Sequence, residues 1–238
     1  PSPELRNIEK KIVRYKRADG VELSIELLLP PNYEEGKPLP TVVYAYPLEY
    51  SNAQTAGQVR GSSNRFMRIW GASHKYFLLR GYAVLDNTAM PMICDPETVY
   101  DSFVPQLVAD AAHTDLFAAG IARSGSYNKT NQPFGFQGER RSLFEATKSY
   151  IECSPTFFAD KVNEPVLIIH GDDDSNPGTL TFQSEVFYEA VRGSGGTARL
   201  VLLPFEDHGY RAKESIEHVL WEQMEWFDRY VKNRKVTE

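Results

Sequence analysis

The chain has 238 residues and a net charge of −6, with 26 lysines and arginines against 32 aspartates and glutamates. A chain of this length buries a full core as one large domain or two small ones. It contains no basic block and no apolar run of about 18 residues, so we expect neither a nucleic-acid partner nor a membrane span. Its two cysteines, Cys94 and Cys153, exclude a disulfide scaffold. They form one bridge or two thiols, and we favour thiols.

The sequence pattern of the first half of the chain predicts mainly strands. Residues 12–17 and 21–29 flank Asp19-Gly20, a pattern typical of an antiparallel hairpin. A short buried strand is expected at 41–46, where Pro47 would end it. The further elements expected in this half are a helix at 73–80 with Gly81 as its C-cap, a strand at 82–86, a loop at 88–96 and a helix at 99–112.

The second half alternates strands with helices. Continuous apolar runs at 165–170 and 199–204 are typical of buried parallel strands. The other expected elements are a strand at 117–123 and helices at 141–151, 181–192 and 212–232. We therefore expect an α/β fold with a mainly parallel sheet, helices on both faces and an N-terminal antiparallel hairpin, as a single domain over residues 1–238.

Polar loops follow two of the predicted strands. Asp172, Asp173 and Asp174 come after the run at 165–170, and His208 comes after the run at 199–204. In open α/β sheets, reactive groups gather beyond the carboxyl ends of the strands. The order of acid and then histidine is that of the α/β-hydrolases, in which the histidine takes a proton from a nucleophile and the acid fixes its tautomer. Either loop alone is more often a solvated turn.

A metal site or a cofactor is not expected. Three adjacent carboxylates on one turn cannot all face one ion, which argues against a metal held by Asp172, Asp173 and Asp174. The sequence does not specify one cellular compartment, and a soluble protein of the cytoplasm or periplasm is expected.

Six stretches match a known family together. They are VVYAYPLEY (42–50), AGQVRGSSN (56–64), LFAAGIARSGSYN (116–128), PFGFQGERRSLFEA (133–146), LIIHGDDDSNPGT (167–179) and LLPFEDHGY (202–210). On these stretches the chain resembles the catalytic domain of the prolyl oligopeptidase family of serine peptidases. The likeness is to its branch of glutamyl endopeptidases and dipeptidyl or acylaminoacyl peptidases. The resemblance implies an α/β-hydrolase fold that hydrolyses short peptides through an acyl-enzyme.

The resemblance also implies residue roles. Asp174 corresponds to the family's triad acid and His208 to its base. Asn176 corresponds to a position that binds a substrate carbonyl. Tyr44 corresponds to the tyrosine that donates to the oxyanion, and Tyr46 is the alternate because it stands where other members have glycine. Core packing is the other interpretation of Tyr44.

The family's nucleophile is missing from this sequence. It is a serine in a Gly-x-Ser-x-Gly turn between a strand and a helix, and the 238 residues contain no such motif. QLVADA (106–111) runs directly into AHTDLF (112–117), where the family has a further βαβ-sized unit of about 30 residues. The apparent gap near 110–113 removes a central strand. Its loss would orphan buried backbone groups of the neighbouring strands, at about 1–3 kcal/mol each.

Three hypotheses account for the missing motif. In the first, the natural protein carries residues here that this sequence lacks, and the protein is a serine peptidase. In the second, the chain is a deletion variant that acts as an inactive binding or interaction domain. In the third, Ser124 is a surrogate nucleophile, because the chain order Ser…Asp…His holds. An esterase would share the same order of acid and base.

The expected partners follow from the resemblance. A peptide substrate is implied, together with the β-propeller domain that screens the site in family members. No propeller blades are recognisable in this sequence, so the face that would meet a propeller is expected to contact another domain or a second copy of the chain.

Overall fold

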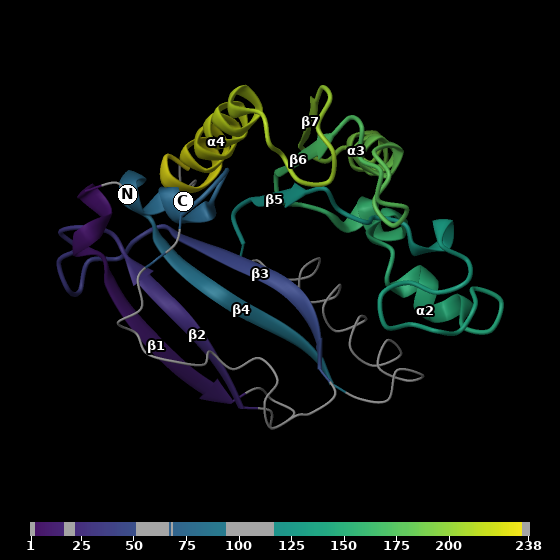
Figure 1. Cartoon of the computed structure of the whole chain (residues 1–238), viewed down its shortest axis with the longest axis horizontal. Coiled ribbons are helices and arrows are strands. Elements are labelled where there is room, and N and C mark those ends of the chain that lie inside the picture. Colours follow the sequence, from purple (N-terminus) through teal and green to yellow (C-terminus); the bar gives the residue numbers. More distant parts are fainter. Residues whose placement is uncertain (1–2, 17–21, 51–66, 68, 94–116, 235–238) are drawn as a thin grey trace. The chain divides into compact units, whose positions relative to one another are not determined.

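The structure is a computed structural model of the whole chain. It describes residues 3–16, 22–50, 67, 69–93 and 117–234 (Figure 1). The chain divides into two compact units, Pro1–Asp95 and Pro96–Glu238. Each unit has its own sheet, and each is described by itself below.

The first unit is a four-stranded sheet with two short helices. Its elements are the 3-10 helix η1 (Pro3–Asn7), β1 (Glu9–Lys16), β2 (Glu22–Leu29), β3 (Thr41–Tyr50), the 3-10 helix η2 (His74–Arg80) and β4 (Ala83–Ile93). The strand order is β1-β2-β4-β3. β1 and β4 run antiparallel to β2, and β3 runs parallel to β4. The two strands of the predicted hairpin are therefore confirmed, while the turn itself lies outside the described residues.

Two predicted boundaries in this unit are wrong. Pro47 does not end β3, and the expected loop at 88–96 is strand as far as Ile93. In the ladder, Pro47 pairs with Met90 and Leu48 pairs with Pro91. Among the described strands, β3 lies at one edge of this sheet, and β4 pairs with β2 only at residues 84–86. Each strand therefore has one edge outside the ladder here, where a sheet tolerates proline.

The helix η2 confirms the prediction for residues 73–80. The Ser73 side chain accepts a hydrogen bond from the backbone N–H of Lys75, and Gly81 closes the helix in the left-handed region at φ 79°. Phe77 and Leu78 are buried.

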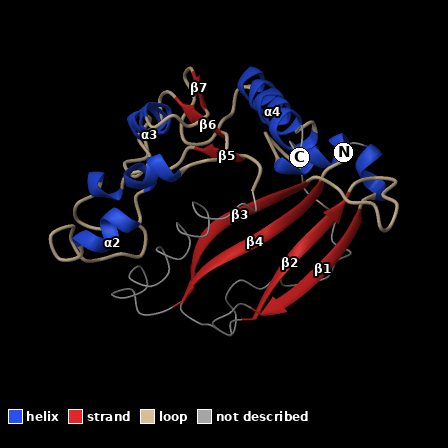
Figure 2. Cartoon of the chain, turned by 180° about the vertical axis from the view of Figure 1, so that it is seen from behind, coloured by secondary structure: helices blue, strands red, loops and turns tan. Residues whose placement is uncertain are grey.

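The second unit is a parallel three-stranded sheet between helices. Its elements are β5 (Gly120–Arg123), the 3-10 helices η3 (Lys129–Asn131) and η4 (Pro155–Lys161), α2 (Thr147–Glu152), β6 (Val166–Gly171), α3 (Phe182–Gly193), β7 (Ala198–Leu203), α4 (Lys213–Phe227) and the π-helix η5 (Asp228–Lys232). The order is β5-β6-β7. Figures 1 and 2 show α3 and α4 on opposite sides of this sheet. The expected parallel sheet with helices on both faces is confirmed.

Only part of the helix expected at 141–151 forms, as α2. Before it, the Glu145 carboxylate accepts from both the backbone N–H and the hydroxyl of Ser142, which closes a turn.

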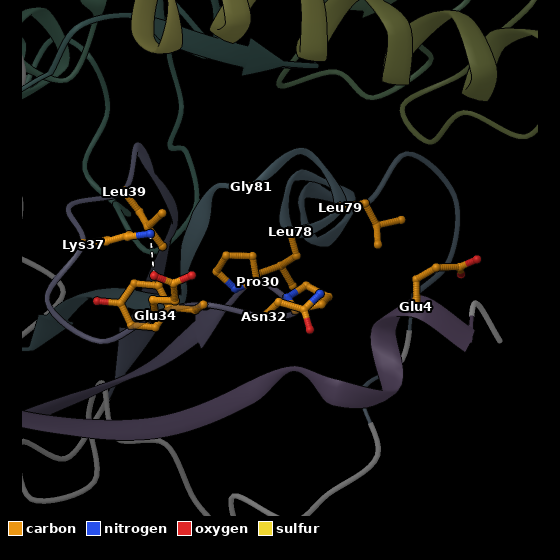
Figure 3. A pocket seen from close by; sticks show the side chains of 11 residues that line it. Glu4, Pro30, Asn32, Glu34, Lys37, Leu39, Leu78, Leu79 and Gly81 are labelled. Atoms are coloured by element: carbon orange, nitrogen blue, oxygen red, sulfur yellow. Dashed lines mark ion pairs between the residues drawn. The ribbon is translucent and has the colours of Figure 1, made fainter.

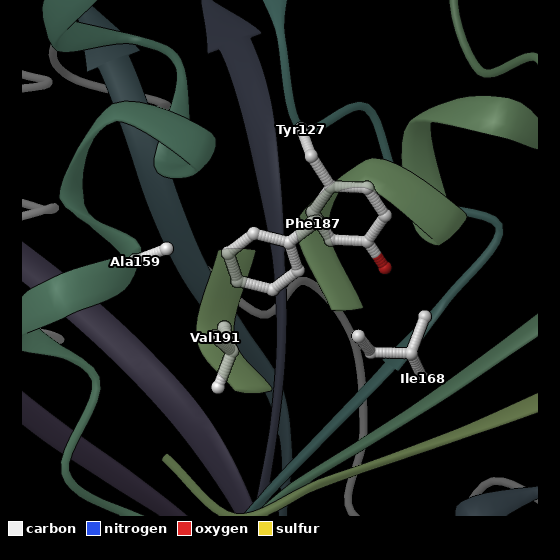
Figure 4. Packing of buried hydrophobic residues seen from close by; sticks show 5 residues of the cluster. All are labelled: Tyr127, Ala159, Ile168, Phe187 and Val191. Atoms are coloured by element: carbon white, nitrogen blue, oxygen red, sulfur yellow. The ribbon is translucent and has the colours of Figure 1, made fainter. Parts of the chain in front are cut away.

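The core of the second unit lies between α3, η4 and β6 (Figure 4). The rings of Tyr127 and Phe187 stack with centroids 4.6 Å apart. Ile168 and Val191 are fully buried beside them. This packing holds α3 against the central strand β6, and the loop between these two elements carries Asp174.

Other expectations have partial outcomes. Cys153 is a buried thiol that forms no disulfide. Cys94, the helix expected at 99–112 and the apparent gap at 110–113 lie outside the described residues. None of the helices in the described ranges is long and apolar enough to cross a membrane.

Candidate functional site

The loops that carry Asp174 and His208 meet at the end of β6. β6 ends at Gly171, where a Cβ atom would lie 2.2 Å from the backbone oxygen of Glu206 and 2.5 Å from that of Asp207. Because Gly171 has no side chain, the loop after β7 can pass directly over the end of β6. Residues that are 34 positions apart in the sequence come into direct contact through this crossing.

Asp174 and His208 form a hydrogen-bonded pair. The Nδ1 atom of His208 lies 2.9 Å from Oδ2 of Asp174. The Asp174 side chain is fully buried, whereas the His208 side chain is 47% exposed. An ionised carboxylate only accepts hydrogen bonds, so the hydrogen of the neutral ring is on Nδ1 and Nε2 is left as a base. A general base in a Ser-His-Asp triad has this tautomer.

Hydrogen bonds keep Asp174 ionised. Burial by itself would raise the pKa of this carboxyl group, but the bonds from His208, the backbone N–H of Asn176 and His170 outweigh it and lower the pKa. The hydroxyl of Thr179 adds another contact, 3.2 Å from Asp174 Oδ2 and 3.0 Å from His208 Nδ1.

Asn176 shapes the acid loop. Its backbone N–H donates to Asp174 Oδ1 at 2.9 Å, and its side-chain oxygen accepts from the backbone N–H of Gly178 at 2.9 Å. The residue is exposed. The predicted contact with a substrate carbonyl would therefore use the side-chain amide nitrogen, because the side-chain oxygen already closes the turn.

Two acids anchor the loop of His208. The carboxylate of Asp207 accepts from the backbone N–H groups of Ser175 and His208, each at 2.8 Å, and these bonds lower its pKa, with Ser175 contributing most. The buried Glu206 accepts from the backbone N–H groups of Arg211 and Ala212, also at 2.8 Å. Burial would raise the pKa of Glu206, but these bonds lower it. Neither the role of Asp207 nor that of Glu206 in holding this loop is predicted from the sequence.

A second histidine contacts the same acid. His170, which follows the apolar residues of PVLIIH (165–170), is fully buried on β6. Its Nε2 atom lies 2.7 Å from Asp174 Oδ2, and its Nδ1 atom lies 2.5 Å from the hydroxyl of Ser184 on α3. From the sequence, His170 is predicted only as the last residue of a strand. A polar residue that closes an apolar run was the available signal.

Tyr44 belongs to the first unit. It lies where the β3–β4 register shifts, and its ring stacks on His74 with centroids 3.7 Å apart. His74 in turn contacts the carboxylate of Asp86 at 2.8 Å. The side chain of Tyr46 is outside the described part of the structure.

Ser124 ends β5 in a left-handed turn. Its φ is 44°, a value that is uncommon for a residue other than glycine. Its hydroxyl lies 3.1 Å from that of Tyr210, which itself donates to the backbone oxygen of Ile169 at 3.0 Å. The hydrogen bond found for this hydroxyl is thus to a tyrosine rather than to a base.

The described residues hold no candidate metal cluster, and the cavity found in the first unit is lined by none of the predicted site residues. In the described ranges, no group of three or more His, Cys, Asp or Glu side chains could hold a metal ion. A surface cavity of about 710 Å³ lies in the first unit (Figure 3). Its walls include Pro30, Leu78 and the ion pair of Glu34 with Lys37, and none of the predicted site residues lines it.

Comparisons with known proteins show which proteins the chain is similar to. The chain is 44% identical over 268 residues to proteins described as probable chloroplastic glutamyl endopeptidases in Oryza sativa subsp. japonica and Arabidopsis thaliana. The matches cover 97% of this chain but only 29% and 28% of those proteins. The aligned length exceeds the 238 residues of the chain, so within the matched region these relatives carry residues that it lacks.

Solved structures share the fold. The dipeptidyl peptidase 4 of Porphyromonas gingivalis matches with a TM-score of 0.68 at 15% identity, over 95% of this chain and 36% of that one. The sequence model described as "Prolyl oligopeptidase family" matches residues 106–234, more than half of the chain. This match over more than half of the chain shows that the chain belongs to the prolyl oligopeptidase family.

Proposed function

We propose that this chain supplies the acid and base of a serine peptidase that cleaves peptides through an acyl-enzyme. The observation that carries the proposal is the hydrogen bond of His208 Nδ1 to the buried, ionised Asp174. In this proposal Asp174 holds the ring in one tautomer and stabilises the imidazolium that forms during the reaction.

His208 moves two protons in the proposed reaction. Its free Nε2 accepts the hydroxyl proton of the serine as the serine oxygen adds to the peptide carbonyl. The same nitrogen then returns the proton to the leaving amine when the peptide bond breaks. Water repeats the sequence to release the acid product and the free serine. Tyr44, with Tyr46 as alternate, donates to the oxyanion, and Asn176 binds a substrate carbonyl.

The nucleophile is proposed to lie in a segment that this sequence lacks. The greater aligned length of the plant relatives supports this. Ser124 is a weaker candidate, because its hydroxyl is bonded to Tyr210. The chain spans less than a third of those relatives. We therefore include in the proposal a partner that screens the site, either a β-propeller or another copy of the chain. The proposed compartment is the cytoplasm or the periplasm.

The test compares the chain with a form that carries the segment. The 27.0 kDa chain and a graft with a family Gly-x-Ser-x-Gly segment near 110–113 are treated with a fluorophosphonate and analysed by intact mass. We expect one adduct on the graft and none on the chain. Peptides with glutamate at the cleaved bond are the first substrates to try, because the plant relatives are described as glutamyl endopeptidases.

The control variants are His208→Ala and Asp174→Asn in the graft. His208→Ala is expected to lower peptide hydrolysis by about 10⁴-fold or more, as for removal of other triad members. Hydrolysis that persists in both variants would overturn the proposal. An adduct on Ser124 of the unmodified chain would overturn only the part that places the nucleophile in a missing segment. Faster turnover of p-nitrophenyl esters with no peptide cleavage would point to an esterase.

The second candidate is an inactive interaction domain. It is favoured by one observation, the lack of Gly-x-Ser-x-Gly in the sequence. It predicts that the natural protein reads directly from QLVADA (106–111) into AHTDLF (112–117) in peptide mass spectra and gains no fluorophosphonate adduct. Partner binding that survives His208→Ala would support it.

A further inference from the structure

We propose that His170 is a positioning residue, which holds the Asp174 carboxylate in place for His208 through a hydrogen bond from Nε2. The inference deepens the proposed function and rests on it. His170 would not touch substrate, since its side chain is fully buried. It would act through Asp174 alone.

The His170 ring is fixed from both ends. Its Nε2 atom lies 2.7 Å from Asp174 Oδ2, and its Nδ1 atom lies 2.5 Å from Ser184 Oγ. Because an ionised carboxylate only accepts, the hydrogen on this side belongs to Nε2. In the neutral ring, Nδ1 then accepts from the Ser184 hydroxyl. The ring thus connects helix α3 to the acid loop.

Both histidines contact one oxygen of the acid. Oδ2 of Asp174 lies 2.7 Å from His170 and 2.9 Å from His208, while Oδ1 accepts from the backbone N–H of Asn176. Without His170, Oδ2 would keep only His208 and Thr179, and Thr179 is itself shared with His208. The rigid donor that sets the direction of Oδ2 independently of His208 is therefore His170.

Other titratable groups face this cluster from neighbouring elements. Asp207 contacts the backbone N–H of His208 from the loop after β7. Tyr210, in the same loop, has a pKa that burial raises, with further contributions from Asp174 and Glu206. A variant at His170 leaves Asp207, Tyr210 and Glu206 in place, so a change at His208 would come through Asp174.

The test uses two side chains of nearly equal shape. His170→Gln keeps an N–H donor near the position of Nε2, whereas His170→Met removes it. Both variants lose the acceptor for Ser184, so their difference isolates the donor. NMR follows the low-field Nδ1–H resonance of His208 and the pH titration of its ring, assigned with His208→Gln. Neither measurement needs the nucleophile, so the chain as it is serves for the experiment.

We expect His170→Gln to keep the resonance and titration of the parent. In His170→Met the resonance should move upfield and broaden, because the hydrogen bond from His208 Nδ1 to the carboxylate weakens. The inference is overturned if folded His170→Met behaves like the parent. It is also overturned if the Gln and Met variants change equally, because the donor would then be irrelevant.

Two further variants cover folding and the underlying function. If His170→Met does not fold, Ser184→Ala loosens the same ring from the other end, and the shift at His208 should have the same sign and be smaller. No shift there would overturn the inference. Asp174→Asn tests the pair itself. If it leaves the His208 titration unchanged, the proposed catalytic pair fails, whatever His170 does.

Discussion

At the scale of single residues, Glu206 links the base to the rest of its unit. The buried carboxylate accepts two backbone N–H bonds at the start of α4, each at 2.8 Å. Glu206→Gln replaces one accepting oxygen with an N–H₂ group that faces a donor. We expect the free energy of unfolding to fall by about 1–3 kcal/mol, the cost of a buried polar group left unsatisfied. Urea unfolding at neutral pH measures it.

The matched control for this variant is Glu214→Gln. Glu214 lies in the first turn of the same helix but is exposed. Removing its charge should change the free energy of unfolding by only a few tenths of a kcal/mol. Equal effects of the two variants would show that helix charge, rather than the two buried bonds, explains the loss.

The residue pair was predictable, but the residues around it were not. The strand ends and the order of acid and histidine indicated the two loops, and the resemblance to the prolyl oligopeptidase family selected Asp174 among three adjacent aspartates. The contacts of His170 with Ser184 and Asp174, and of Thr179 with Asp174, depend on how α3 and the acid loop pack against β6. No local sequence pattern contains this information.

At the scale of elements, the crossing of two loops depends on Gly171. A Cβ there would lie 2.2 Å from the backbone oxygen of Glu206, so Gly171→Ala must displace the loop of His208. We expect about 1–3 kcal/mol of destabilisation, as for other overpacked sites. Gly193→Ala is the control, because a Cβ there meets nothing within 4 Å. If both alanines have the same effect on the unfolding midpoint, the crossing tolerates a side chain.

The docking of η2 in the first unit depends on Asp86. Burial would raise the pKa of this carboxyl group, but hydrogen bonds from His74 and Lys75 lower it to about 2. A lowered pKa stabilises the folded state above the ordinary value of 3.8, and the stabilisation disappears as the pH falls toward 2.

Asp86→Asn should therefore lower the free energy of unfolding by about 1–2 kcal/mol at neutral pH. The difference from the parent should shrink between pH 4 and pH 2, the range bounded by the two pKa values of Asp86. Glu34→Gln removes an acid from an exposed ion pair and is expected to change little. A difference that stays constant with pH would contradict the role of the charge.

Element types were predicted better than element ends. The apolar runs at β6 and β7 identify buried parallel strands because both faces are covered. Pro47 and Pro91 misled the prediction, since a proline, which has no backbone N–H, ends a strand only where the neighbouring strand needs an N–H at that position. Whether that N–H is needed depends on strand order, which the local sequence does not contain.

At the scale of the whole molecule, the missing segment has a thermodynamic consequence. The described strands form two sheets, and no ladder among them joins β3 to β5. Each unit has buried apolar residues of its own, such as Phe77 in the first and Ile168 in the second. The expectation of a single domain over residues 1–238 stays a prediction.

We predict that the chain unfolds in two calorimetric transitions, because each unit has its own sheet and core. Asp86→Asn should lower one midpoint and Gly171→Ala the other. In the graft that carries the family segment, a strand able to pair with both β3 and β5 would couple the units, and each variant should then shift one common transition. If both variants shift a single transition in the chain without the segment, its two units already unfold as one, and the segment is needed for the nucleophile alone.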